Sequence, residues 1–119
     1  MTTLYNFIRD SGGYNGCALM PSDQIWTANL AAATATPLLV PSDASNYVVY
    51  INVEPAKSVW MATSGTAAIP AGATFSKENS FLINGNYNPN PAFMVKGGST
   101  LSFISTAGTA ISVMFFRTQ

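Results

Sequence analysis

This sequence has very little charge and no histidine. Its 119 residues include five Lys or Arg and five Asp or Glu, so 8% of the chain is charged and the net charge is zero, whereas a soluble domain averages about 25% charged residues. The basic residues are scattered singly, and without a basic cluster to neutralise phosphates we expect no nucleic-acid partner. A nearly neutral surface also repels its own copies weakly, which favours self-association.

Catalytic and metal-binding residues are equally scarce. Cys17 is the single cysteine, so it forms no disulfide within the chain, and no histidine is present to convert it to a catalytic thiolate. A zinc site of Cys and His ligands cannot be assembled, and a site for a hard cation stays open only in principle because no Asp-rich loop occurs. The five carboxylates stand singly, and no nucleophile elbow or phosphate-binding glycine loop is found. We therefore expect a non-enzymatic protein with no cofactor and no metal.

The sequence also has no long uninterrupted apolar run. Three charge-free stretches, residues 24–42, 58–76 and 97–116, approach the length of a membrane span. Each is broken by proline or paired glycines and by many hydroxyl residues, so we expect no membrane-spanning helix. The N-terminus lacks the basic start and apolar run of a signal peptide.

In place of charge the chain has 12 Ser, 12 Thr and 10 Asn, and Val, Ile and Thr together make 26 β-branched residues. Residues 47–53 alternate, so that Tyr47, Val49, Ile51 and Val53 form one apolar face, as in a half-buried strand. Turn signals recur about every ten residues after Pro37. Many short strands at this spacing predict an all-β fold, either an antiparallel jelly-roll-like β-sandwich or a small barrel.

The expected elements follow from this pattern. We predict an irregular N-terminal arm over residues 1–24 and a β-sandwich domain over residues 25–119. The strands are expected around Ile25, at 38–40, 47–53, 59–63, near Phe75, and at 81–83, 92–95, 101–103 and 110–116. Two hairpins are predicted, one joining 47–53 to 59–63 through the turn at Pro55, and one joining 101–103 to 110–116 through the loop at 106–109.

Two of these strands carry apolar residues on their second face as well. Val48 and Tyr50 lie opposite the apolar face of the first strand, and Met114 and Phe116 occupy the same position on the last. A single sandwich core does not require these residues, and interfaces are typically poor in Lys, Glu and Asp but rich in aromatics and Met. We interpret Val48, Tyr50, Met114 and Phe116 as a candidate interface. The alternative is that the chain's own loops cover them.

An Asn- and Pro-rich segment at 84–91 suggests a second type of site. Its aromatic residue can stack on a sugar while its amides bond to sugar hydroxyls, so Asn84, Asn86, Tyr87 and Asn88 form a candidate ligand loop. The alternative is that Tyr87 only anchors its own loop and that Trp26 and Trp60 fill the core.

Together, several segments resemble a known group of proteins. The chain is similar to small β-rich virion structural proteins of tailed bacteriophages in residues 47–53, Val59-Trp60, 68–72, 93–103 and 109–115. Those proteins accompany the major capsid protein as decoration or cement subunits, or form head-fibre and tail-associated knobs. The resemblance covers residues 36–116 and implies a subunit located in the virion that binds the major capsid protein, or another virion component, and its own copies. We expect a homotrimer. The alternative function is a carbohydrate-binding module of a fibre or tail.

Overall fold

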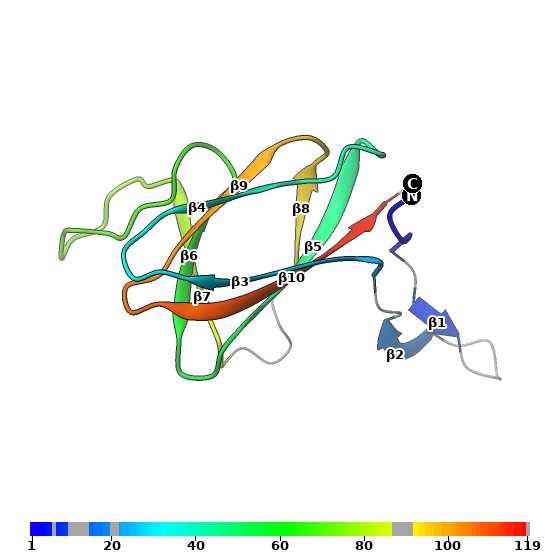
Figure 1. The fold of residues 1–119 in the computed structure, drawn as a ribbon, viewed down its shortest axis with the longest axis horizontal. Helices are drawn as coiled ribbons and strands as arrows, with labels where there is room; N and C mark the ends of the chain where they lie inside the picture. Colours follow the sequence, from blue (N-terminus) through cyan, green and yellow to red (C-terminus); the bar gives the residue numbers. More distant parts are fainter. Residues whose placement is uncertain (6, 10–14, 20–21, 87–91, 119) are drawn as a thin grey trace.

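The computed structural model describes residues 1–5, 7–9, 15–19, 22–86 and 92–118 (Figure 1). Every regular element in these ranges is a strand. The strands are β1 (Phe7–Arg9), β2 (Asn15–Leu19), β3 (Gln24–Leu30), β4 (Thr36–Leu39), β5 (Asn46–Val53), β6 (Ser58–Ala62), β7 (Ser80–Asn84), β8 (Ala92–Lys96), β9 (Thr100–Ile104) and β10 (Thr109–Arg117). The described part of the chain contains no helix long and apolar enough to cross a membrane.

Eight of the strands form two four-stranded sheets that face each other. The first sheet has the order β3-β10-β5-β8 and the second has the order β4-β9-β6-β7, and all pairs are antiparallel. The chain changes sheet at every connection from β3 to β10 except the one between β6 and β7 (Figure 1). This is the strand order of a jelly roll. The predicted all-β sandwich is confirmed.

Both predicted hairpins are wrong. β5 pairs with β10 and β8, whereas β6 lies in the opposite sheet and pairs with β7 and β9. β9 and β10 are likewise in different sheets. The connections of both pairs cross from one sheet to the other. The prediction failed because alternation shows which face of a strand is buried but not which strand lies beside it.

The strand predicted near Phe75 is also absent. Residues 63–79 form a loop between β6 and β7, and the Phe75 side chain is fully exposed. Apolar residues do alternate up to Phe75, but Pro70 and Gly72 interrupt the segment and the alternating positions before Phe75 are small alanines, so a stable strand does not form. Side-chain bonds from Asn79 Nδ2 to the Ser64 and Thr66 carbonyls, at 2.9 and 3.0 Å, hold the loop together instead.

The core lies between the inward faces of the two sheets. The predicted apolar face of β5 is confirmed, since Tyr47, Val49 and Ile51 are at most 1% exposed. The other strands of both sheets complete the core with every second residue. Within the first sheet, the rings of Tyr47 and Phe115 meet edge to face with centroids 6.4 Å apart. Each such fully buried side chain stabilises the fold by about 1.5–3 kcal/mol through the apolar area removed from water.

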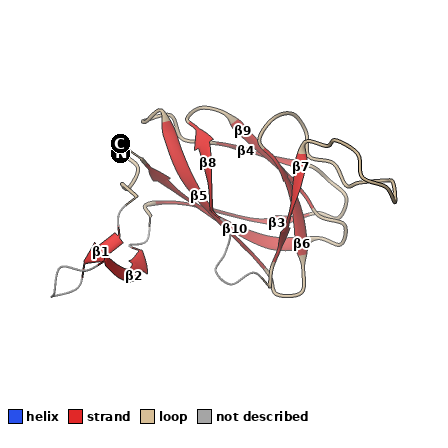
Figure 2. Ribbon diagram, turned by 180° about the vertical axis from the view of Figure 1, so that it is seen from behind, coloured by secondary structure: helices blue, strands red, loops and turns tan. Residues whose placement is uncertain are grey.

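The N-terminal segment has two structurally distinct parts. Residues 2–5 lie along the end of β10: the Arg117 N–H donates to the Thr3 carbonyl at 2.9 Å, and the Tyr5 N–H donates to the Arg117 carbonyl at 2.8 Å. The β1–β2 hairpin then stands apart from both sheets, close to the adjacent chain termini, in both views (Figures 1 and 2). An N-terminal arm was predicted here, but the attachment of its first residues to the sheet was not.

Candidate interaction surfaces

The four predicted interface residues lie together on the outer face of the first sheet. In the antiparallel register, Met114 of β10 lies opposite Tyr50 of β5, and Phe116 lies opposite Val48. Two further apolar side chains extend this row to both edges of the sheet, because Ile25 of β3 pairs with Met114 and Met94 of β8 pairs with Val48. We call this set the outer apolar band: Ile25, Val48, Tyr50, Met94, Met114 and Phe116.

The N-terminus covers the middle of the outer apolar band. The Tyr5 ring stacks on Tyr50 with centroids 6.0 Å apart and meets Phe116 edge to face, also at 6.0 Å. The Tyr5 and Tyr50 hydroxyls are hydrogen bonded at 2.9 Å. Burial, followed by this hydrogen bond, raises the pKa of Tyr50 to about 12. Phe116 is 0% exposed, so here the chain itself covers a predicted interface residue.

The two ends of the band remain open to solvent. Ile25 is 51% exposed and Met94 is 69% exposed. Of the four predicted residues, Val48, Tyr50 and Met114 keep partial exposure. Sequence reasoning missed Ile25, Met94 and Tyr5, because the register that aligns them with the band comes from strand pairing and not from local pattern.

Two carboxylates hold the N-terminus in place. Asp43 accepts hydrogen bonds from the Tyr47 hydroxyl and from the backbone N–H and hydroxyl of Thr2. These bonds, that of Tyr47 above all, lower the pKa of Asp43 to about 2. Asp23 accepts from the N–H and hydroxyl of Thr3, both at 2.9 Å, and the backbone bond is the main cause that lowers the pKa of Asp23. Both carboxylates are therefore committed to structural bonds.

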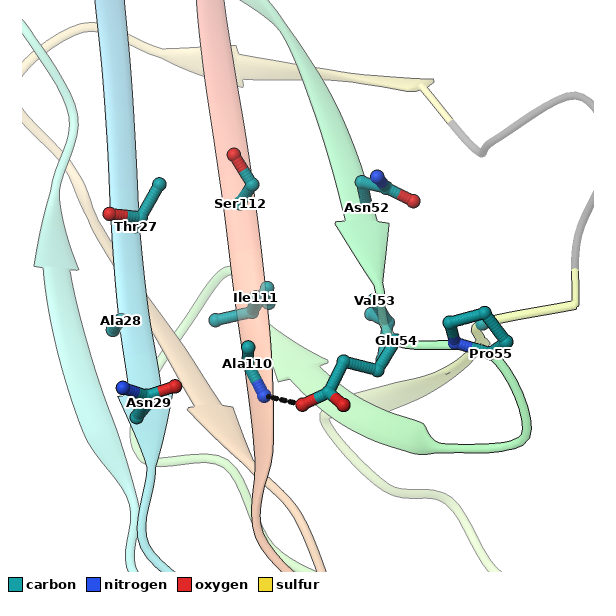
Figure 3. A pocket seen from close by; sticks show the side chains of 11 residues that line it. Thr27, Ala28, Asn29, Asn52, Val53, Glu54, Pro55, Ala110, Ile111 and Ser112 are labelled. Atoms are coloured by element: carbon teal, nitrogen blue, oxygen red, sulfur yellow. Dashed lines mark hydrogen bonds between the residues drawn. The ribbon is translucent and has the colours of Figure 1, made fainter.

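A groove of about 650 Å³ lies on the same outer face, beyond the outer apolar band (Figure 3). We call it the polar groove. Thr27, Ser112 and Asn52 form a row across its floor, because their positions on β3, β10 and β5 are paired. Glu54 lies at its end, where its Oε1 atom accepts a hydrogen bond from the Ala110 N–H at 2.6 Å. Hydroxyl, amide and carboxylate groups here suit hydrogen bonding to a polar ligand.

The polar groove contains one acidic side chain. Glu54 is the single acid among the described residues that line it, and none of those residues is aromatic. Glycoside hydrolysis requires two carboxyl groups across the scissile bond. The arrangement suits hydrogen bonding to a polar ligand.

The predicted ligand loop borders the polar groove. Asn84 Oδ1 accepts from the Asn86 N–H at 2.8 Å, and Asn86 Oδ1 accepts from the Ala56 N–H at 3.1 Å. Gly85, between them, lines the groove. These bonds tie the described part of the loop to the turn between β5 and β6. The other two predicted residues, Tyr87 and Asn88, lie outside the described residues.

A second groove, of about 350 Å³, opens between the edge strands β3 and β4. We call it the edge groove. It is mainly apolar and reaches the core residues Phe103 and Val113. Trp26 lies at its side and is 48% exposed, so the expectation that this tryptophan fills the core is not met. Trp60 is partly buried and packs on a smaller cluster around Ile104.

Charge is almost absent from the two sheets. Among the eight strands that form them, the only charged residues are Lys96 and Arg117, and each is the last residue of its strand. Arg117 Nε also donates to the Thr2 carbonyl at 2.8 Å. Apart from the ends of β8 and β10, the strands of the sandwich therefore present apolar or neutral polar side chains.

Nothing in the described ranges points to a metal centre, since no three His, Cys, Asp or Glu side chains there could hold an ion together.

Comparison of the chain with known proteins finds no match. No protein-family model matches it, and no curated protein or solved structure is significantly similar to it.

Proposed function

We propose that this protein is a non-enzymatic virion structural protein, a capsid decoration or cement subunit that binds the major capsid protein and its own copies. The observation that carries the proposal is the outer apolar band, whose ends stay exposed on a sheet with no charge except at its strand ends. Interfaces have this composition. The two exposed ends flank the cover formed by the N-terminus, and a contact with a protein shell would remove this apolar surface from water.

The resemblance of residues 36–116 to small phage virion proteins supports the same proposal. The jelly-roll order fits it too, but jelly rolls occur in lectins as well as in viral capsids, so the fold does not separate the two candidate functions. The distinction depends on the surface. Large hydrophobic strand residues are exposed on it, as in Met94 and Leu39 at 69% and 65%, which favours protein contacts over sugar contacts.

The test uses a matched pair of charge substitutions. Met94→Lys places a cation in the outer apolar band, and Leu39→Lys places one on β4 of the second sheet at a similar exposed fraction. We expect Met94→Lys to weaken co-sedimentation with capsid shells, while Leu39→Lys leaves it unchanged. Density for the subunit in a map of the intact particle is the independent check. No co-sedimentation of the wild-type chain, or equal loss in both variants, contradicts the proposal.

Carbohydrate binding is the second candidate, favoured by the polar groove beside the predicted ligand loop. A glycan array would show a hit that is lost in Asn52→Ala, at the groove floor, and in Tyr87→Ala, in the loop. A hit that survives both substitutions places sugar recognition elsewhere. An array without any hit leaves the shell-binding proposal as the better one.

A further inference from the structure

Strand β3 forms a free sheet edge without the usual protection against strand pairing. An edge strand presents unpaired N–H and C=O groups, and natural proteins protect such edges with charge, proline, bulges or short length. In β4 the protection is Pro37, in β8 it is Lys96, and in β7 it is the short length of five residues. Three of the four edge strands therefore have a feature that protects them against pairing with another strand, and β3 is the exception.

The β3 strand has none of these features. It is seven residues long, Gln-Ile-Trp-Thr-Ala-Asn-Leu, with no charge and no proline. Its pairing with β10 runs without a bulge over seven consecutive residue pairs. On its other side it has no strand neighbour among the described residues. Backbone groups that point away from β10 in an antiparallel edge of this length are matched most directly by another strand.

We propose that β3 pairs antiparallel with β3 of a second copy of this chain, about a twofold axis through Thr27. Thr27 is the middle residue of β3, so this register uses the whole strand and joins two first sheets into one of eight strands. A twofold contact is self-complementary, as the commonest dimer interfaces are. The inference rests on the proposed self-association and names the surface that carries it.

The side chains of β3 fit this register. On the side of the edge groove, the half-exposed indole of Trp26 lies against Ala28 of the partner subunit, so that a large residue covers a small one on both sides of the axis. Residues directly opposite in an antiparallel pair have Cβ atoms about 4.5–5.5 Å apart. On the outer face, Ile25 extends the outer apolar band to the contact between the two β3 strands. Since β3 has no charged residue, no like charges meet across the axis.

The occupant is a second copy because β3 is uncharged along its whole length. A basic or acidic partner peptide would find no opposite charge on β3. A seven-residue strand pair covers less than the roughly 800 Å² per partner of a standard stable interface, so we expect a reversible dimer as the building unit. This twofold unit differs from the homotrimer expected from the sequence, which stays a prediction.

Charge substitutions at Thr27 test the axis directly. The Thr27 side chain is exposed, and in the proposed register it faces its own copy. Thr27→Lys and Thr27→Glu should each weaken dimerisation in analytical ultracentrifugation by about fivefold or more, because like charges become directly opposite. An equimolar mixture of the two should restore association. Thr63→Lys, in the exposed loop after β6, is the matched control and should leave the dimer unchanged.

A cross-link gives a second measurement of the same geometry. Opposite Cα atoms in antiparallel strands lie about 4.5 or 5.5 Å apart, within the range of a disulfide. Thr27→Cys in a Cys17→Ser background should therefore form a covalent dimer with an added oxidant, whereas Ser64→Cys in the same background should not.

The outcomes separate this inference from the proposed function. An oligomer that Thr27→Lys does not weaken overturns the β3 contact and leaves self-association intact. Weakening in both charge variants without restoration in the mixture overturns the twofold register. A wild-type chain that stays monomeric at high micromolar concentration, yet sediments with capsid shells, overturns β3 pairing and retains the decoration function. A chain that does neither overturns both.

Discussion

Replacing Phe116 by Ala tests whether this predicted interface residue has become part of the fold. Phe116 is 0% exposed and meets the rings of Tyr5 and Tyr50 edge to face, at 6.0 and 5.8 Å. Truncating a buried Phe costs about 3–5 kcal/mol. We expect about 3 kcal/mol for Phe116→Ala, the lower end of that range, because only one aromatic layer covers the site and can settle onto Ala.

The assay is urea unfolding followed by tryptophan fluorescence and far-UV circular dichroism, at a concentration where light scattering shows one species. Thermal unfolding gives a second measurement. An unfolding entropy of about 2.1 cal/mol/K per residue implies about 0.25 kcal/mol/K for a chain of 119 residues, so a loss of about 3 kcal/mol should lower Tm by about 12 °C. Met94→Ala is the control on the same face, and its 69% exposure predicts a loss of under about 0.5 kcal/mol.

A double-mutant cycle with Tyr5→Ala isolates the contact itself. The coupling between Tyr5 and Phe116 should be about 0.5–1.5 kcal/mol, the usual contribution of an aromatic pair beyond its buried area. If Phe116→Ala costs less than about 1 kcal/mol, the cover formed by the N-terminus contributes little in solution. Phe116 would then be available to a partner, and its structural role would be refuted.

Two further predictions concern backbone packing and pH. Gly85→Ala should destabilise the protein by about 1–3 kcal/mol in urea unfolding, because a Cβ there would lie 1.9 Å from the Glu54 carbonyl oxygen, while Gly72→Ala, with nothing within 4 Å, should change little. Stabilisation from the Asp43 carboxylate, whose pKa is lowered chiefly by the Tyr47 hydroxyl, should be complete above pH 4 and disappear as pH falls through about 2. The stability difference between wild type and Asp43→Asn should follow that profile, and a difference independent of pH between 5 and 2 contradicts it.

Much of the fold could be predicted from local pattern. The alternation in residues 47–53 predicts a strand with a buried face, and β5 covers Asn46–Val53 with Tyr47, Val49 and Ile51 buried. Turn residues between apolar runs likewise predict most of the remaining strands to within a few residues. Phe75 shows the limit of the method, because an alternating segment that contains Pro70 and Gly72 does not make a strand.

Strand pairing could not be predicted in the same way. β5 and β6 are close in sequence and joined by a turn-like linker, yet they belong to opposite sheets. A strand with one apolar face can bury it in either layer of a sandwich, and neither the linker nor the alternation selects the layer. The choice depends on the simultaneous packing of all eight strands.

The candidate surfaces also contain some residues that local pattern predicts and others that only strand pairing brings together. Val48 and Met114 could be picked from the sequence because they stand on the second face of strands already recognised. Their extension to Ile25 and Met94, and the cover that Tyr5 places over Phe116, follow from pairings between residues far apart in the chain. No local signal marks them.

The sequence by itself determined the class of fold and the near absence of charge from its strands, since both follow from residue type and period-two alternation. The tertiary structure alone decided where that neutrality matters. It buries Phe116 beneath the N-terminus, leaves Met94 exposed on one edge strand of the first sheet, and leaves the outer side of β3, the other edge strand, without a strand neighbour among the described residues. The physical reason is that burial and edge exposure are properties of the strand order, which long-range packing selects.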